Sequence, residues 1–221
     1  MTEELLDDKI ENGNLTLPFS LSYVKGPFKG WKYTFFLSLI LSALAGLVLY
    51  YMEYIFFRNN NPMDWSQDYF EQIQTQEYRD FQSTYSTLQL TGTLLFIIAG
   101  LSLLTNFIFH LVVLYRHWSV IQKVNNPSAT PGTAVGFLFI PFFNIYWMFI
   151  AFYKLSVDQK RFIQQYGVNV RQQPMAGLAL ASVICRLIPY LGNVTMLILG
   201  PMRIFNQQKV SEDIVKQYGN G

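Results

Sequence analysis

Arg186 has the clearest chemical potential in this chain, because it stands within a long apolar stretch. A guanidinium stays charged at physiological pH, and placing it in a membrane without a partner costs several kcal/mol. Such a cation pairs with an anion, with backbone carbonyls or with water. We therefore predict that Arg186 either binds an anionic ligand or belongs to a structural polar network.

Two amide side chains accompany this arginine, each beside a helix-breaking proline. Asn144 follows Pro141 closely, and Asn193 follows Pro189 in the same way. Proline removes a backbone N–H, and an amide can pair with the backbone groups that the break leaves open. We predict that the two asparagines and Arg186 form a ligand-binding or structural polar network, with the two prolines marking helix breaks.

The sequence contains no constellation typical of catalysis or metal binding. His110 and His117 are the two histidines; they lie about 10 Å apart along a helix, too far for one helix to direct both at one metal. The apolar stretches hold no paired carboxylates and no phosphate-binding glycine loop. The single cysteine, Cys185, excludes an internal disulfide. We expect a non-enzymatic protein without a cofactor or a metal.

The composition indicates a membrane protein. Hydrophobic residues make up 51% of the chain and charged residues 14%, against about 25% charged in an ordinary soluble domain. Four blocks reach the roughly 20 apolar residues that a spanning helix needs. The blocks are residues 33–57, 88–115, 132–153 and 175–202. They predict an all-α integral membrane helical bundle with four membrane-embedded segments.

The last two blocks, with the residues that follow them, repeat each other. Ile140, Pro141, Asn144, Lys154, Gln159 and Lys160 in the first copy correspond to Ile188, Pro189, Asn193, Arg203, Gln208 and Lys209 in the second. We predict an internal repeat whose copies are each broken at the Pro-Asn motif.

The flanking charges predict the orientation. Lys25, Lys29 and Lys32 precede the first block, whereas the following loop is acidic, which places the N-terminus in the cytoplasm and the loop outside. The chain then divides into a cytoplasmic tail (1–32), a membrane domain (33–205) with a helical outer loop (58–87), and a second cytoplasmic tail (206–221).

The third and fourth blocks allow two arrangements. If each crosses the membrane as a kinked helix, the basic link that holds Lys154, Lys160, Arg161 and Arg171 lies outside, against the positive-inside rule. If each Pro-Asn break is instead the tip of a shallow hairpin, that link is cytoplasmic, but the arms are short and their tips need cover. Both arrangements place the C-terminus in the cytoplasm.

Small residues predict where the helices pack. Ser38, Ser42 and Gly46 recur at four-residue steps in the first block, so they share one helix face on which another backbone can approach closely. The same pattern is compatible with a single bundle and with a homo-oligomer.

The segment Gly136–Trp147, with its Ile-Pro-x-x-Asn-x-x-Trp core, resembles a group of uncharacterised bacterial multi-pass membrane proteins, similar to domain-of-unknown-function family 4328. The resemblance covers this block and, more weakly, the helix before it. It implies a bacterial inner membrane, and it implies no activity, cofactor or catalytic residue.

Taken with the residues above, these patterns predict a multi-pass protein of the inner (plasma) membrane that acts as a non-enzymatic scaffold or interaction component. The alternative is a small transporter or channel subunit in which Arg186 and the two breaks hold an anionic ligand. The expected partners are the lipid bilayer and either a second copy or another membrane protein. Nothing in the sequence favours nucleic acid.

Overall fold

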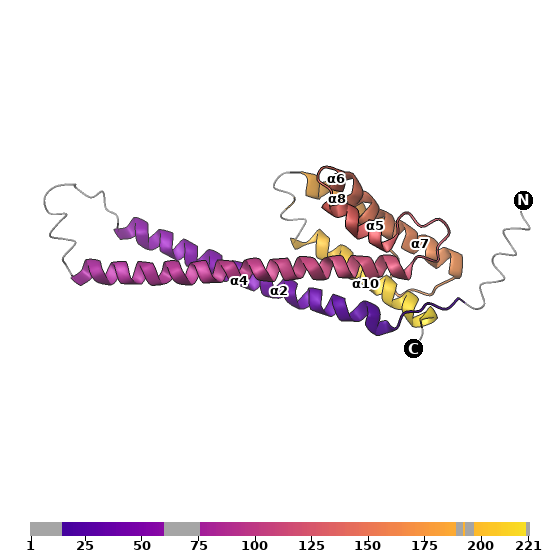
Figure 1. The fold of residues 1–221 in the computed structure, drawn as a ribbon, viewed down its shortest axis with the longest axis horizontal. Helices are drawn as coiled ribbons and strands as arrows, with labels where there is room; N and C mark the ends of the chain where they lie inside the picture. Colours follow the sequence, from indigo (N-terminus) through magenta and orange to yellow (C-terminus); the bar gives the residue numbers. More distant parts are fainter. Residues whose placement is uncertain (1–14, 60–75, 189–191, 193–196, 220–221) are drawn as a thin grey trace, which may run out of the picture. The chain divides into compact units, whose positions relative to one another are not determined.

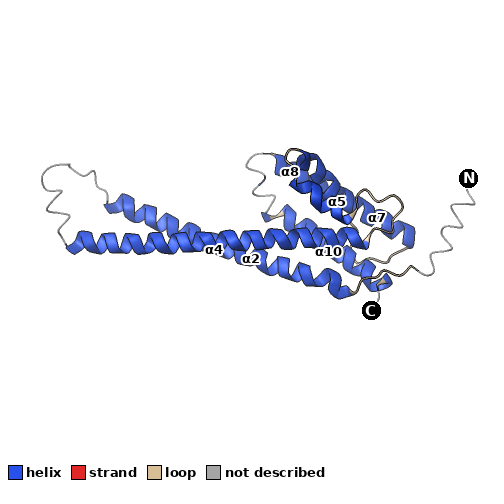
Figure 2. Cartoon of the chain, viewed as in Figure 1, coloured by secondary structure: helices blue, strands red, loops and turns tan. Residues whose placement is uncertain are grey.

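Helices form every regular element in the part of the chain that the structure describes (Figures 1 and 2). The computed structural model describes residues 15–59, 76–188, 192 and 197–219. The elements are α2 (Leu21–Asn59), α4 (Gln76–Val120), α5 (Pro131–Gly136), η2 (Phe137–Phe139), α6 (Phe143–Met148), η3 (Phe149–Lys154), α7 (Leu155–Tyr166), α8 (Ala176–Leu187) and α10 (Leu199–Tyr218). The all-α prediction is confirmed for these residues.

Two of the helices are long and apolar enough to cross a membrane. They are α2 and α4, over Leu21–Ile55 and Arg79–Val120. These helices contain the first two predicted blocks. The other two blocks, residues 132–153 and 175–202, are each divided among shorter helical pieces.

The chain divides into two compact units. We call Trp31–Ile108 the helix-pair unit, and we call Met1–Gly30 together with Phe109–Gly221 the hairpin unit. The helix-pair unit contains α2 from Trp31 to its end and most of α4, whereas all of the shorter helices and α10 belong to the hairpin unit.

Within the helix-pair unit, α2 and α4 pack antiparallel. At one end, the amide of Asn106 donates hydrogen bonds to the carbonyl of Trp31 at 3.0 Å and to Oγ1 of Thr34 at 3.1 Å. Further along, a Cβ added at Gly92 would lie 3.3 Å from the Val48 side chain. Residue numbers therefore rise along α2 as they fall along α4.

Small side chains line this contact at steps of seven and three residues, which fit the heptad spacing of a coiled-coil seam. The buried small residues are Ser38 and Ala45 on α2, and Gly92, Ala99 and Ser102 on α4.

Of the three residues of the predicted packing face of α2, only Ser38 lies in the contact with α4. Ser38 is buried, but Ser42 is exposed, and a Cβ added at Gly46 would meet nothing within 4 Å. A strict four-residue step drifts around a helix of 3.6 residues per turn, whereas alternating steps of three and four keep facing the partner.

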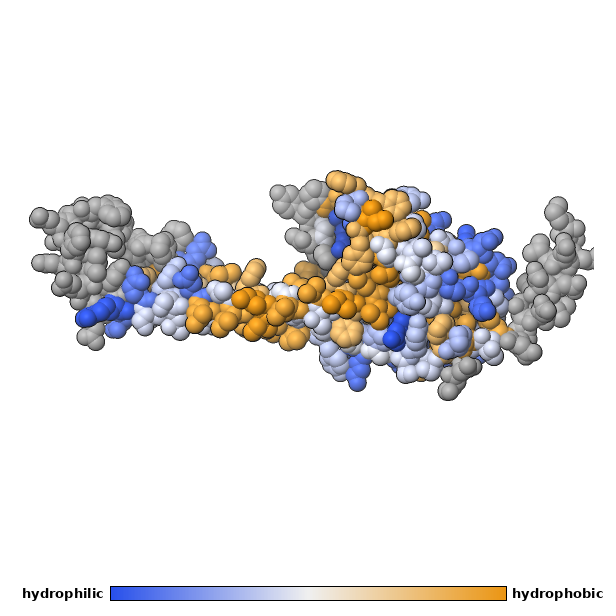
Figure 3. Space-filling view, in the orientation of Figure 1, coloured by the Kyte–Doolittle hydropathy of each residue, from blue (hydrophilic) through white to orange (hydrophobic). Residues whose placement is uncertain are grey.

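The outward faces of the helix-pair unit carry large apolar side chains (Figure 3). In the most apolar window of each helix, 11% of residues are buried for α2 and 22% for α4. The core helix of a soluble protein would be mostly buried. These faces are instead left uncovered by the described chain.

The first hairpin of the hairpin unit reverses the chain direction at residues 140–142. The ring of Phe137, before the reversal, lies 4.7 Å from the ring of Trp147, after it. At the base, the backbone N–H of Ser128 donates to Oδ2 of Asp158 at 2.7 Å. Because these pairs bring together residues at increasing distances from the reversal, the arms run antiparallel.

Proline chemistry accounts for this reversal. Pro141 has no N–H to continue the helix, and the residue before a proline avoids the helical conformation. Ile140 is accordingly extended, with φ −83° and ψ 115°. Phe142 then takes a positive φ of 60°, which is unusual for a side chain of its size.

The second hairpin has α8 and α10 as its arms, and these two helices contact each other. The side chain of Asn206 on α10 accepts a hydrogen bond from the N–H of Met175 at 2.9 Å and donates one to the carbonyl of Gln173 at 3.1 Å. Arg171 and Asp213 form an ion pair at 2.8 Å further from the reversal. α8 ends at Leu187, and Ile188 is extended like Ile140.

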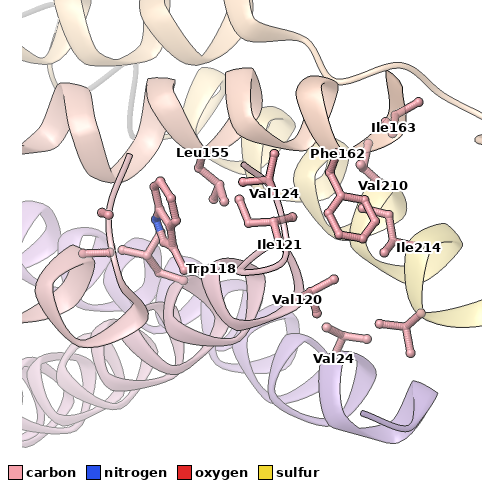
Figure 4. Packing of buried hydrophobic residues seen from close by; sticks show 14 of the residues in the cluster. Val24, Trp118, Val120, Ile121, Val124, Leu155, Phe162, Ile163, Val210 and Ile214 are labelled. Carbon is pink, nitrogen blue, oxygen red and sulfur yellow. The ribbon is translucent and has the colours of Figure 1, made fainter. Parts of the chain in front are cut away.

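The apolar core of the hairpin unit draws on both hairpins and on the hairpin-unit ends of α2 and α4 (Figure 4). Its largest fully buried apolar side chains include Trp118, Ile121, Leu155, Phe162 and Ile214. The indole N–H of Trp118 donates to the carbonyl of Ala151 at 3.1 Å, so the hydrogen-bond donor of this buried side chain has a partner.

Parts of both predicted tails belong to this unit. Residues 206–218 continue α10, and most of them are buried. At the other end of the chain, the N–H of Leu17 donates to the carbonyl of Tyr218 at 2.7 Å, and Leu17 itself is buried. The two ends of the described chain therefore lie together.

Candidate functional site

α10 is buried on most of its surface although its sequence is polar. Buried polar groups need hydrogen-bond partners, because leaving one unpaired costs about 1–3 kcal/mol. We use the name α10 network for the buried polar side chains that meet around this helix. They are His117, Ser156, Gln159, Gln207, Gln208 and Ser211.

One half of the α10 network connects α4 with α10. Nε2 of His117 lies 2.9 Å from Oε1 of Gln208. Because an amide oxygen only accepts, His117 donates through Nε2. The amide nitrogen of Gln208 then donates to the carbonyl of Val24 at 3.3 Å and to Glu212 at 2.9 Å.

The other half connects α10 with η3 and α7. The amide nitrogen of Gln207 donates to the carbonyl of Phe152 and to Oγ of Ser156, both at 3.0 Å. Gln159 reaches back and donates to the carbonyl of Gln207 at 3.1 Å and to Oγ of Ser211 at 3.0 Å. η3 is a π-helix, whose wider turn accompanies these side-chain bonds to its carbonyls.

A proline in α2 creates a further need for a donor. Pro27 lies inside α2 and has no N–H for the carbonyl of Tyr23, four residues earlier. The guanidinium of Arg116 donates to that carbonyl, and its Cζ lies 4.4 Å from the centre of the Tyr23 ring. Arg116 therefore has a structural role at this interruption of α2.

Arg203 differs from the neutral side chains of the α10 network because it carries a charge, although Oε1 of Gln159 is also buried without a hydrogen-bond partner. The side chain of Arg203 is 4% exposed, and its Nε is buried without a hydrogen-bond partner. Its Cζ lies 4.0 Å from the centre of the Phe152 ring, a cation–π contact of about 2 kcal/mol when desolvated. No carboxylate in the described part of the chain pairs with it.

The charge of Arg203 persists despite this burial. The guanidinium group of arginine stays charged in proteins even when it is buried. At pH 7 the guanidinium is therefore still protonated. A cavity of about 10 Å³ adjoins it and is lined by His110, Val113, Leu114, His117, Ile204 and Gln207. This space is about that of one water molecule.

The predicted site residues are only partly within the described structure. Arg186 lies in the last turn of α8 and is exposed, with no ion pair among the described residues. Asn144 is half-buried, and its backbone N–H donates to the carbonyl of Ile140 across the break after Pro141. Pro189 and Asn193 lie outside the described residues. The predicted network of Arg186 with the two asparagines therefore stays a prediction.

Sequence reasoning missed Arg203 as a site residue, although the repeat contained a signal for it. Arg203 corresponds to Lys154, and the neighbouring Gln-Lys pairs behave alike in the two copies. Gln159 and Gln208 are both buried, whereas Lys160 and Lys209 are both exposed. Because Arg203 belongs to the same repeat as Gln159 and Gln208, it was a candidate for burial as well.

Comparisons with known proteins add no assignment. No family model, no curated protein and no solved structure matches this chain. The resemblance at Gly136–Trp147 therefore stays a prediction. Among the residues that the structure describes, no three His, Cys, Asp or Glu side chains are grouped to hold a metal ion.

Proposed function

We propose that this chain is an integral protein of a bacterial inner membrane and acts as a non-enzymatic scaffold or interaction component. In this proposal α2 and α4 cross the membrane, and both termini lie in the cytoplasm. The observation that carries it is the contrast between large apolar side chains exposed on the helix-pair unit and polar side chains buried in the hairpin unit.

The dimensions of the helix-pair unit support the crossing. Exposed apolar side chains run from Tyr33 to Tyr54 on α2 and from Leu90 to Ile108 on α4. Each stretch is about 30 Å long by the rise of a helix, the thickness of a bilayer core. The small residues in the contact also fit, because helices in lipid associate through close packing rather than through the hydrophobic effect.

The hairpin unit supports two further membrane-embedded segments of a different kind. The arm formed by α5 and η2 has 6 and 3 residues, and α8 has 12. These arms are about 14 Å and 18 Å long, too short to cross a bilayer. We propose that the two hairpins enter the membrane from the cytoplasm and return to it, as two copies of one repeat.

The tip of the first hairpin supports this insertion. The Phe142 side chain is 88% exposed, and its residue holds a strained positive φ. Strain of this kind costs about 1–3 kcal/mol and is retained mainly where a function needs it. Insertion of the exposed Phe142 ring into lipid would offset the free-energy cost of this strain.

The geometry supports a scaffold better than the alternative of a small transporter or channel subunit for an anionic ligand. Transport past Arg203 needs a water-filled path, whereas the cavity beside Arg203 has the volume of one water. The α10 network also uses its amide donors for backbone carbonyls, which favours a rigid unit. The proposed partners are the bilayer and either a second copy or another membrane protein.

Cysteine labelling in intact cells tests the proposed topology. In a Cys185→Ser background, Ser83→Cys places a thiol at an exposed position of α4 before its apolar stretch, and Gln164→Cys places one at an exposed position of α7. We expect an impermeant maleimide added from outside to label Ser83→Cys and to leave Gln164→Cys unlabelled until the cells are permeabilised.

Two results would count against this topology. Labelling of Gln164→Cys alone would show that the true orientation is the reverse of the proposed one. Labelling of both variants would show that the link after the first hairpin lies outside. The latter would favour kinked crossings over hairpins. Anion flux in proteoliposomes that Arg203→Gln abolishes would favour the transporter.

A further inference from the structure

A groove lies on the surface of the hairpin unit beside Arg116. Its volume is about 420 Å³, within the roughly 300–1,000 Å³ of small-molecule sites. Its walls come from α2, α4 and α5, and all of them belong to the hairpin unit. The lining residues are Tyr23 of α2, Leu111, Val112, Tyr115 and Arg116 of α4, and Val135 of α5.

The spacing of the α4 residues accounts for the layout of the groove. Leu111 and Tyr115 are four residues apart, and so are Val112 and Arg116. Residues at this spacing lie one turn apart on the same side of a helix. Because side chains on a helix lean toward its N-terminus, the Arg116 side chain leans toward Val112. The groove therefore places one guanidinium beside apolar side chains.

The guanidinium of Arg116 is held in place, but only part of its hydrogen-bonding capacity is used. One N–H donates to the carbonyl of Tyr23, and Cζ lies 4.4 Å from the centre of the Tyr23 ring. A guanidinium has five N–H donors, and no carboxylate in the described part of the chain forms an ion pair with Arg116. Arg116 is half-buried, so a ligand in the groove can reach the remaining donors. The groove is therefore complementary to a molecule with an anionic end and an apolar body.

The place of Arg116 in the sequence puts this cation at the level of lipid headgroups. Residues 88–115 contain no Asp, Glu, Lys or Arg, and Arg116 is the first charged residue after that block. In the proposed topology it follows a membrane helix on the cytoplasmic side, where basic residues and tyrosines such as the exposed Tyr115 are enriched. A phospholipid presents its phosphate at this level and its acyl chains deeper, the order in which Arg116 and Leu111 occur along α4.

We propose that the groove binds one anionic phospholipid of the cytoplasmic leaflet. Arg116 binds the headgroup phosphate through its remaining donors, because the fork of a guanidinium matches phosphate oxygens. Leu111, Val112 and Val135 contact an acyl chain. A basic pocket between membrane helices on the cytoplasmic side is a recurrent kind of lipid site. This inference rests on the proposed membrane location, and it adds a bound lipid that the scaffold proposal does not require.

Native mass spectrometry of the purified full-length protein in a neutral detergent tests the inference. Titrations with phosphatidylglycerol and with phosphatidylcholine give an apparent Kd for each lipid, and glycerol 3-phosphate is the competitor without acyl chains. Arg116→Gln removes the charge of the groove. Arg79→Gln is its matched control, because it removes the same charge from an exposed position near the other end of α4. Val112→Trp fills the groove and keeps Arg116, and Leu104→Trp is its control at an exposed position.

We expect one phosphatidylglycerol to stay bound per chain, with a lower apparent Kd than phosphatidylcholine, whose choline cation offsets the charge of the phosphate. Arg116→Gln and Val112→Trp should each raise the apparent Kd about tenfold, through a lost charge-assisted hydrogen bond and through lost apolar contacts. Arg79→Gln and Leu104→Trp should keep the native Kd. The Tm of each variant without lipid separates lost binding from lost folding. Val112→Trp leaves the bond from Arg116 to Tyr23 intact, so it decides the matter if Arg116→Gln folds poorly.

Several outcomes would overturn the inference. Equal binding of the two lipids would show that the headgroup charge has no role, and equal loss in Arg79→Gln would show a general attraction to basic residues. A native Kd in Val112→Trp would show that the lipid binds elsewhere. Displacement of the lipid by glycerol 3-phosphate at equal concentration would show a site for a free anion.

A second copy of the chain is the other occupant that this experiment would reveal. Dimers without bound lipid that Val112→Trp dissociates would assign the groove to that copy and would contradict the lipid site. Carbonate-resistant membrane association of the chain in cells tests the membrane proposal separately, so either claim can fail alone.

Discussion

The helix-pair unit and the hairpin unit place polar and apolar side chains in opposite ways. In the helix-pair unit, small residues such as Ser38 and Gly92 are buried, and large apolar side chains such as Phe96 face outward. In the hairpin unit, large apolar side chains and the α10 network share the interior. The first arrangement suits lipid. The interior of the hairpin unit instead resembles the core of a soluble domain, although we propose that the tips of its two hairpins enter the membrane.

The hydrophobic effect should stabilise the hairpin unit and not the helix-pair unit. The largest expected difference in unfolding free energy is therefore that between Trp118→Ala and Phe96→Ala. Trp118→Ala removes a fully buried indole and leaves the carbonyl of Ala151 without its donor. We expect a loss of about 3–5 kcal/mol in unfolding free energy, measured in detergent micelles. Phe96→Ala removes an aromatic ring that is 69% exposed, and we expect a change within about 0.5 kcal/mol. Similar losses at both positions would remove the contrast between the units.

Polar side chains should contribute to stability inside the hairpin unit and hardly at all on the outer faces of the helix-pair unit. Gln207→Leu leaves the carbonyl of Phe152 and the hydroxyl of Ser156 unpaired in the interior. We expect a loss of about 2–3 kcal/mol. Thr105 is exposed, and its hydroxyl bonds only to the carbonyl of Leu101 in its own helix. Thr105→Val should leave the melting temperature nearly unchanged, and a larger effect there than at Gln207 would contradict the account.

Two glycines test the packing face within the helix-pair unit. A Cβ at Gly92 would already lie 3.3 Å from Val48, so Gly92→Leu should cost about 1–3 kcal/mol through overpacking. Gly46→Leu adds the same side chain where nothing lies within 4 Å, and we expect it to be neutral or stabilising in micelles. The reverse order of stabilities would restore the four-residue face predicted from the sequence.

The sequence predicted the all-helical class and located α2 and α4, because apolar blocks of this length are typical of membrane-spanning helices. It also located a helix break at Pro141, because proline acts through its own covalent structure, but it left open whether the break was a kink or the tip of a hairpin. It did not predict the register of the helix pair, since Ser38, Ser42 and Gly46 repeat at steps that differ only slightly from those of a heptad seam. That difference becomes visible only against the partner helix.

The burial of α10 was also beyond sequence reasoning. Residues such as Gln207, Gln208 and Asp213 read as solvent-exposed, because a polar side chain is buried only when the rest of the fold supplies its partners. Those partners come from His117, Ser156 and Arg171, far away in the sequence. No local pattern contains this information, and the repeated Gln-Lys pair was its only trace.

Spin-label accessibility in liposomes tests the central claim most directly. In a Cys185→Ser background, single nitroxide labels are placed at Phe96 on the outer face of α4, at Tyr146 near the first reversal, and at Gln164 on α7, all exposed positions. Oxygen concentrates in lipid, and a nickel chelate stays in water. We predict high oxygen and low nickel accessibility at Phe96 and Tyr146, and the opposite at Gln164. Nickel access at Phe96 equal to that at Gln164 would contradict the membrane account.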